Sequence, residues 1–157
     1  MDNSTPTLTK FITFQTAGHW FALPMAAILR IVNCPPPDKG GVVTFGVVQL
    51  GSHTVQLLDL YGIFGVGTNA TLPDQVPFLL VLQSDQKRLW GIALESPPDL
   101  IELPLTAFQS VSSDKNFFPR KQWISHIAVV SELDVSRTLL LLDLEAVFSH
   151  EHKAMAA

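Results

Sequence analysis

Cysteine is nearly absent from this sequence, since its 157 residues contain only Cys34. One thiol cannot form an internal disulfide, and structural zinc sites need several cysteine or histidine ligands at short spacings. We expect Cys34 to behave as a small apolar side chain that is buried or half buried. The missing cysteine framework also fits a reducing compartment, and we expect the protein to be cytoplasmic.

Charge is scarce as well. Charged residues make up 15% of the chain, and the formal net charge is −4. Nucleic-acid-binding domains carry clustered Lys and Arg, whereas the only adjacent basic pairs here are Lys87-Arg88 and Arg120-Lys121, each in a polar turn. The composition therefore argues against nucleic acid as a partner.

Long hydrophobic runs are missing. The longest apolar stretches, such as Val76–Leu82 and Leu139–Leu142, fall far short of the roughly 20 residues that a membrane helix needs. The opening Met1–Thr7 is polar and has no basic start that leads into an apolar run, so we expect no signal peptide. We predict a protein that does not insert into a membrane.

Catalytic and metal-binding motifs are also missing. None of the five histidines has a Cys, Asp or Glu at metal-ligand spacing, and His19 and His53 fall in expected hairpin turns, where solvation is usual. There is no Gly-x-Ser-x-Gly motif, and the glycines at 62, 65 and 67 lack the Gly-Lys-Ser/Thr ending of a phosphate loop. We predict no catalytic residue, no cofactor and no metal.

What the sequence does contain is a series of short apolar runs bounded by turn residues, a pattern typical of strands. The ten expected strands cover Phe11–Phe14, Trp20–Leu23, Pro24–Asn33, Val42–Leu50, Thr54–Leu58, Phe78–Leu82, Leu89–Leu94, Leu100–Leu103, Trp123–Val130 and Thr138–Leu142. We predict an all-β fold with short helices.

The two halves of the chain repeat each other. Leu57–Phe64 (Leu-Leu-Asp-Leu-Tyr-Gly-Ile-Phe) is similar to Leu141–Phe148 (Leu-Leu-Asp-Leu-Glu-Ala-Val-Phe). Phe14-Gln15-Thr16 with Trp20–Leu23 likewise matches Leu82-Gln83-Ser84 with Leu89–Ile92. Two like halves of about five strands each predict two similar five-stranded β-barrels, because closure removes the exposed edges of a small sheet.

Each copy of the longer repeat contains an aspartate that leaves a strand, Asp59 or Asp143, followed by Leu-x-x-(Ile or Val)-Phe. An aspartate in this position is typical of a helix N-cap, because its carboxylate accepts hydrogen bonds from the unpaired first amides. We therefore assign both aspartates to capping, with Leu60 and Phe64, or Leu144 and Phe148, packing on the barrels.

These blocks resemble the CheW-like scaffold family of bacterial chemosensory systems, from about Phe11 to Phe148. Ile28-Leu29-Arg30-Ile31 stands where the family has Val-x-Glu-Ile, and Gly46–Leu60 matches Gly-Val-Ile-Asn-Leu-Arg-Gly-x-Ile-Ile-Pro-Val-Ile-Asp-Leu. Gly91–Glu95 is similar to the family's Gly-Leu-Leu-Val-Asp, and Leu140–Leu144 closes the match.

The resemblance implies one CheW-like domain over residues 8–150, made of two intertwined SH3-like barrels, with tails at 1–7 and 151–157. It implies a non-catalytic adaptor that couples a chemoreceptor-type protein to a CheA-type histidine kinase. The partner-binding residues that it suggests are Ile28, Arg30, Ile31, Val47, Val48, Gln49, Leu50 and Gly51. Phe117 and Phe118, in a polar connection, extend this set as a candidate apolar patch. The alternative interpretation is that the residues on the strands belong to the barrel core.

The chain departs from the family pattern at Arg30 (family Glu), Gly51 (Arg), Ser52 (Gly), Gln56 (Pro) and His126 (Gly). We expect Arg30 and Gly51 to lie on neighbouring strands, where the family's opposite charges would pair. With the partner arginine replaced by glycine, Arg30 is expected to be exposed, without an acidic partner in this chain, and to change binding specificity.

Two rival functions stay open. A small-ligand-binding or enzymatic β-barrel would need convergent polar groups inside a pocket, which the sequence does not display. A structural component of a larger assembly that has lost signalling would keep the fold and bind different partners.

Overall fold

A computed structural model describes residues 7–34, 46–58, 60, 64, 77–111, 123–132 and 134–149. The strands in this part of the chain are β1 (Leu8–Thr16), β2 (His19–Pro24), β3 (Ile28–Asn33), β4 (Val47–Leu50), β5 (His53–Leu57), β6 (Phe78–Gln83), β7 (Leu89–Leu94), β8 (Asp99–Pro104), β9 (Gln109–Ser110), β10 (Ile124–Glu132) and β11 (Val135–Leu142). Two single-turn 3₁₀ helices, η1 (Met25–Ala27) and η3 (Leu105–Ala107), follow β2 and β8. The all-β prediction is confirmed.

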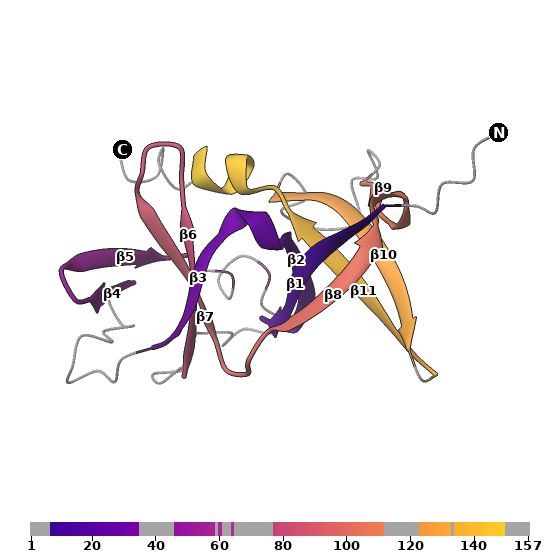
Figure 1. Cartoon of the computed structure of the whole chain (residues 1–157), viewed down its shortest axis with the longest axis horizontal. Coiled ribbons are helices and arrows are strands. Elements are labelled where there is room, and N and C mark those ends of the chain that lie inside the picture. Colours follow the sequence, from indigo (N-terminus) through magenta and orange to yellow (C-terminus); the bar gives the residue numbers. More distant parts are fainter. Residues whose placement is uncertain are drawn as a thin grey trace. The chain divides into compact units, whose positions relative to one another are not determined.

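The chain divides into two compact units. Unit 1 comprises the described residues of Met1–Thr13, Trp20–Met25 and Asp99–Ala157, and unit 2 those of Phe14–His19 and Ala26–Pro98. One sheet has the strand order β8-β1-β2-β11-β10-β9, and the other has the order β3-β6-β7-β5-β4 (Figure 1). β1 therefore begins in unit 1 and ends, at its hairpin tip, in unit 2.

The two sheets share one topology. Each contains a hairpin (β1–β2 or β6–β7) whose second strand pairs in parallel with a strand of another hairpin (β10–β11 or β4–β5). Each also has an antiparallel strand on the outer side of the first hairpin, β8 beside β1 and β3 beside β6. The predicted similarity of the halves is thus present strand by strand, with the two-residue β9 as an addition to the first sheet.

The register agrees with the sequence repeat to the residue. In one sheet Leu57 lies opposite Gly91, and in the other Leu141 lies opposite Ala22. The repeat aligns Leu57 with Leu141 and the Trp20–Leu23 block with Leu89–Ile92, which makes Gly91 and Ala22 equivalent. A one-residue slip would turn every side chain of a strand to the other face, so a shared register means a shared core pattern.

The strand that follows each first hairpin pairs in the other sheet. β3 follows the β1–β2 hairpin in the chain but pairs with β6, and β8 follows the β6–β7 hairpin but pairs with β1. Each sheet is therefore completed by a strand whose preceding strand in the chain belongs to the other sheet.

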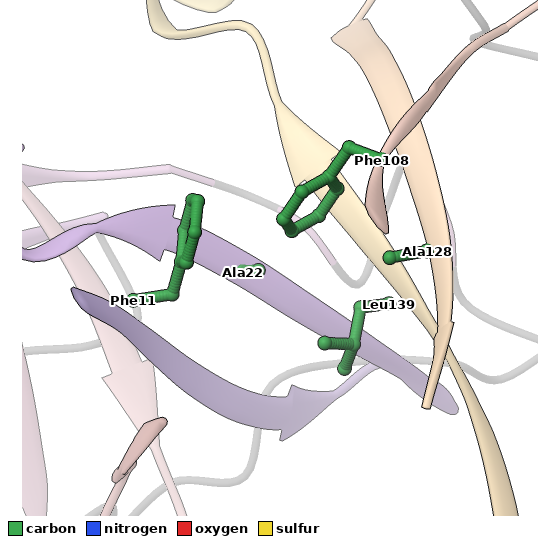
Figure 2. Close-up of a cluster of buried hydrophobic side chains, with 5 residues drawn as sticks. All are labelled: Phe11, Ala22, Phe108, Ala128 and Leu139. Carbon is green, nitrogen blue, oxygen red and sulfur yellow. The ribbon is translucent and has the colours of Figure 1, made fainter. Parts of the chain in front are cut away.

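Part of the core of unit 1 is a cluster of side chains from four strands and the segment before β9. Figure 2 shows Phe11, Ala22, Phe108, Ala128 and Leu139, which form a buried cluster. The rings of Phe11 and Phe108 lie 4.8 Å apart at a tilt of 47°, a favourable aromatic arrangement. At the edge of this cluster the Arg137 guanidinium lies 4.3 Å from the centroid of the Trp20 ring.

In unit 2 the equivalent cluster consists of Val48, Val55, Leu79 and Val81. It closes over Gly91, where an added Cβ would lie 2.8 Å from Leu79 Cδ1 and 2.8 Å from Val55 Cγ1. The β-branched Val55 has little rotamer freedom to move away. Glycine is therefore required for the close approach of β7 to its neighbours in this unit, whereas the equivalent Ala22 is accommodated in unit 1.

A helix over residues 144–149 follows β11 (yellow in Figure 1). The Asp143 carboxylate accepts a hydrogen bond from the Ala146 N–H at 3.3 Å, and the Asp143 carbonyl accepts one from the Val147 N–H at 3.0 Å. The predicted capping role of Asp143 is confirmed, although the most deeply buried side chain of this helix is Val147. Asp59 lies outside the described residues.

Several predicted boundaries need correction. The run from Pro24 to Asn33 divides into η1 and β3, because the Met25–Ala27 turn redirects the chain before β3 starts. The hairpin near the C-terminus is longer than expected, because β11 begins at Val135 instead of Thr138. Asp134 adopts a left-handed φ of 66° that fits a tight turn there.

Substituting Gly91→Ala should lower the free energy of unfolding by about 1–3 kcal/mol, because the new methyl group overpacks the core of unit 2. Chemical denaturation monitored by circular dichroism measures this loss. In a Val55→Ala background the same substitution should cost less, since the Cγ1 atom that it meets is gone. An equal cost in both backgrounds would refute the assigned clash.

Candidate partner-binding surface

The predicted residues Ile28, Arg30 and Ile31 lie on β3, which carries exposed apolar side chains. Leu29 is 50% exposed and Ile31 is 41% exposed, while Ile28 is half buried. Ile28 lies opposite Leu82 and Arg30 opposite Val81, so Leu29 is the extra residue of a β-bulge. A bulge leaves its extra residue outside the regular ladder and bends the strand, which accounts for the outward position of Leu29.

The faces of β3 are divided between core and surface. Val32 packs against the buried cluster of unit 2, and the adjacent Ile31 points to the opposite face because strand side chains alternate. Within the described residues β3 pairs with β6 alone, so one side of its backbone has no strand neighbour. We call Ile28–Ile31 the β3 surface.

Arg30 is exposed, and no acidic side chain in the described part of the chain pairs with it. The guanidinium presents a planar fork of donors suited to a carboxylate. Its side chain lies on the face of β3 opposite to that of Ile31, because strand side chains alternate, and its cross-strand neighbour is Val81 on β6.

Most of the predicted residues on the β4–β5 hairpin are buried or half buried. Val48 is 0% exposed and belongs to the core cluster of unit 2, so its side chain cannot meet a partner, and the core alternative holds for this residue. Val47 and Leu50 are half buried, and Leu50 packs against the same cluster. Only Gln49 and Gly51 of this set are exposed.

The exposed end of this hairpin is internally hydrogen bonded. Gln49 Nε2 donates to the Gly51 carbonyl at 3.0 Å, and Thr54 Oγ1 donates to Gln49 Oε1 at 2.8 Å. Gly51 adopts a left-handed φ of 57°, which glycine tolerates without strain.

The expected adjacency of Arg30 and Gly51 is wrong. β3 and β4 occupy the first and last positions of the five-stranded order, with β6, β7 and β5 between them. The parallel pairing of β5 with β7 separates strands that follow one another in the chain. No cross-strand pair therefore joins positions 30 and 51 in the described part of the chain.

The cysteine and two of the histidines considered in the sequence analysis contact other parts of the fold. Cys34 is half buried beside the core of unit 2, and burial raises the pKa of its thiol, as expected for an apolar role. His19 is not the solvated turn residue that was expected, because its Nε2 lies 3.0 Å from the Phe64 carbonyl oxygen and the residue is half buried. His126 Nδ1 lies 2.9 Å from Ser125 Oγ beside a register shift in β10. Phe117 and Phe118 lie outside the described residues.

Metal and membrane features are absent from the same part of the chain. Within it, no group of three or more His, Cys, Asp or Glu side chains is arranged to hold a metal ion. No described helix is long and apolar enough to cross a membrane.

The family model of the CheW-like domain matches residues 10–152. The chain belongs to the CheW-like family. The resemblance inferred from the sequence is thereby confirmed.

The solved structures include a CheW of the same fold. The scaffolding protein TtCheW from Thermoanaerobacter tengcongensis is similar with a TM-score of 0.63, covering 94% of this chain and 92% of that chain. At 14% identity, this likeness supports the CheW-like fold alone. No sequence among the curated proteins matches the chain significantly.

Sequence reasoning missed most of the exposed apolar side chains, namely Leu8, Met25, Leu29, Leu100, Leu105, Val129 and Val135. The repeat could have identified Leu100 as the equivalent of Ile31. Leu100 lies opposite Ile12 on β1, just as Ile31 lies opposite Leu80 on β6. The alignment of Phe14 with Leu82 makes Ile12 and Leu80 equivalent, and hence Leu100 and Ile31.

Replacing Gln56 by methionine should stabilise the protein by about 1 kcal/mol. The buried Gln56 Oε1 has no hydrogen-bond partner among the described residues, and a desolvated acceptor without a partner carries a penalty that a thioether of similar shape avoids. Thermal unfolding measures the gain, with Gln49→Met as the control because that amide is exposed and hydrogen bonded. A lower melting temperature for Gln56→Met would mean that Gln56 Oε1 accepts a hydrogen bond in solution.

Proposed function

We propose that this CheW-like protein is a non-catalytic cytoplasmic adaptor that couples a chemoreceptor-type protein to a CheA-type histidine kinase. The observation that carries the proposal is the β3 surface, where Leu29 and Ile31 are exposed on an edge strand of unit 2. Large aliphatic side chains on an edge strand favour association, because they bury apolar area and the strand backbone offers free donors and acceptors.

Partner choice in this proposal depends on Arg30. An exposed guanidinium favours a partner with a carboxylate at the matching position, and it opposes a partner with a basic group there. The family pattern has Glu at this position, so the charge preference of the contact is reversed. We therefore expect a partner whose docking surface is acidic where the usual partner is basic.

Two alternatives remain open. A small-ligand-binding or enzymatic barrel would need convergent polar groups in a pocket, and an assembly component that has lost signalling would use the same fold with other partners. Capture of partners from a lysate of the native host, followed by their identification, discriminates among the three. Capture of a histidine kinase or receptor supports the adaptor. Capture of a pilus or envelope component supports an assembly component that has lost signalling.

Substituting Ile31→Asp should abolish capture of the kinase or receptor while changing the melting temperature little. Interface anchors are commonly worth about 2 kcal/mol or more, whereas exposed substitutions usually change stability by less than about 0.5 kcal/mol. The measurement is a pull-down with wild type and variant in parallel, together with thermal unfolding of each.

Val129→Asp is the matched control, because it also places an acid at an exposed β-branched position, here on β10 of unit 1. It should leave capture intact. Undiminished capture by Ile31→Asp would remove the β3 surface from the proposal, and unfolding of that variant would assign Ile31 to the core.

A further inference from the structure

β10 is longer than the strand beside it. It spans Ile124–Glu132, whereas β9, its neighbour on the side away from β11, pairs only with His126 and Ile127 (Figure 1). Among the described residues, no strand lies on this side of β10 between Ala128 and Ser131. We call Ala128–Ser131 the β10 edge.

The register of the hairpin indicates where the backbone groups of the β10 edge point. Glu132 lies opposite Val135, so β10 and β11 are joined by a two-residue connection. A hairpin of this kind ends in a pair that exchanges backbone hydrogen bonds, and such pairs recur at every second residue. Val130 is therefore hydrogen bonded to β11, whereas the N–H and C=O groups of Val129 and Ser131 point to the other side.

The side chains agree with this assignment. The hydroxyl oxygens of Ser131 and Ser136, which lie opposite each other, are 3.1 Å apart. Side chains approach more closely in an antiparallel pair that lacks backbone hydrogen bonds. The backbone donors and acceptors of Ser131, and of Val129 two residues earlier, are thus directed away from β11.

The β10 edge lacks the features that usually protect an exposed strand edge. Its sequence, Ala-Val-Val-Ser, contains no charged residue and no proline, and its pairing with β11 is regular. Val129 is 65% exposed. A large apolar side chain beside outward-pointing donors and acceptors favours the addition of another strand.

A second copy of the same edge has the matching groups. Two β10 edges that lie antiparallel about a two-fold axis at Val130 place Val129 opposite Ser131 of the other copy. Both residues of this pair direct their N–H and C=O groups outward, so the pair exchanges backbone hydrogen bonds, and its symmetry mate does the same. The two Val129 side chains lie diagonally across one face, and the edge brings no like charges together because it has none.

We propose that this protein forms a symmetric dimer through the β10 edge, in which the sheets that contain β10 in two copies join into one. The contact is isologous, so it closes at two copies. A strand pair this short buries less than the roughly 1,200 Å² of a standard interface, so the dimer is weak and forms at high protein concentration.

The dimer goes beyond the proposed function, because it uses no residue of the β3 surface. A dimer carries two β3 surfaces, and a partner with two matching sites would bind it with increased avidity. Binding through β3 and dimerisation through β10 involve different strands, so the two proposals can fail separately.

Sedimentation equilibrium over rising protein concentration tests the dimer. The weight-average mass of wild type should rise from that of the monomer towards that of the dimer. Val129→Asp brings two carboxylates into the contact and should weaken association by at least roughly tenfold. Thermal unfolding of the variant checks that the fold is retained.

Ser131→Pro tests the backbone pairing itself. Proline removes an N–H that points away from β11, so the hairpin keeps its hydrogen bonds while the dimer loses one from each copy. Ser136→Pro is the matched control, because it removes the same hydroxyl contact and changes the same cross-strand pair, but on β11. Association should fall by roughly tenfold in Ser131→Pro and stay at the wild-type value in Ser136→Pro.

Hydrogen exchange of wild type provides a measurement that does not depend on how the proline variants fold. The amides of Val129 and Ser131 should exchange more slowly as the protein concentration rises. A wild type that stays monomeric, amides whose exchange does not change with concentration, or equal association of Ser131→Pro and Ser136→Pro would each overturn the dimer.

Partner capture separates this inference from the proposed function. Loss of kinase or receptor capture in Val129→Asp, with a monomeric wild type, would assign the β10 edge to that partner and overturn the dimer. Undiminished capture by Ile31→Asp would contradict the proposed function alone.

Discussion

The parallel pairing within each sheet is the constraint on which the rest of this structure depends. β5 with β7, and β11 with β2, bring together segments from distant parts of the chain in one common register. The backbone contact is extended by the Leu58 N–H, which donates to the Gly91 carbonyl at 2.9 Å. Because β7 has to lie close to β5 and β6 at that point, Gly91 has no room for a side chain.

This pairing also decides which strands are left at the sheet ends. With two hairpins joined in parallel at the centre, the remaining outer position in each sheet is taken by the strand that leaves the other sheet's hairpin. β3 and β8 therefore each complete a sheet and also present side chains to solvent. Their inner faces supply Val32 and Ile101 to the two core clusters, and their outer faces leave Ile31 and Leu100 to solvent. For an adaptor, end strands that hold the fold together and remain exposed on one face are suitable places to bind other proteins.

Much of this arrangement could be predicted from the sequence because the two halves repeat. The Leu-Leu-Asp-Leu blocks gave the correct relation between Leu57 and Leu141, and Asp143 caps its helix as expected. Prediction failed where pairing depends on distant segments. Arg30 and Gly51 were expected to lie on neighbouring strands, but β3 and β4 do not pair.

The burial of individual side chains was also predicted poorly, because the sequence of a short apolar strand does not show which of its residues face the core. Val48 and Ile31 are both β-branched and stand in matching family motifs, yet one is fully buried and the other exposed. The bulge that turns Leu29 outward has no mark in the sequence.

We propose that the two units, each completed by a strand continuous with the other's hairpin, fold as one cooperative domain, which the family resemblance placed at residues 8–150. Native-state hydrogen exchange in increasing denaturant tests it most directly, by following the amides of the two parallel ladders, β5–β7 and β11–β2. The account predicts that both ladders exchange through one global opening, with the same free energy and the same dependence on denaturant. Exchange of one ladder through a separate opening of lower free energy, while the other stays protected, would contradict it.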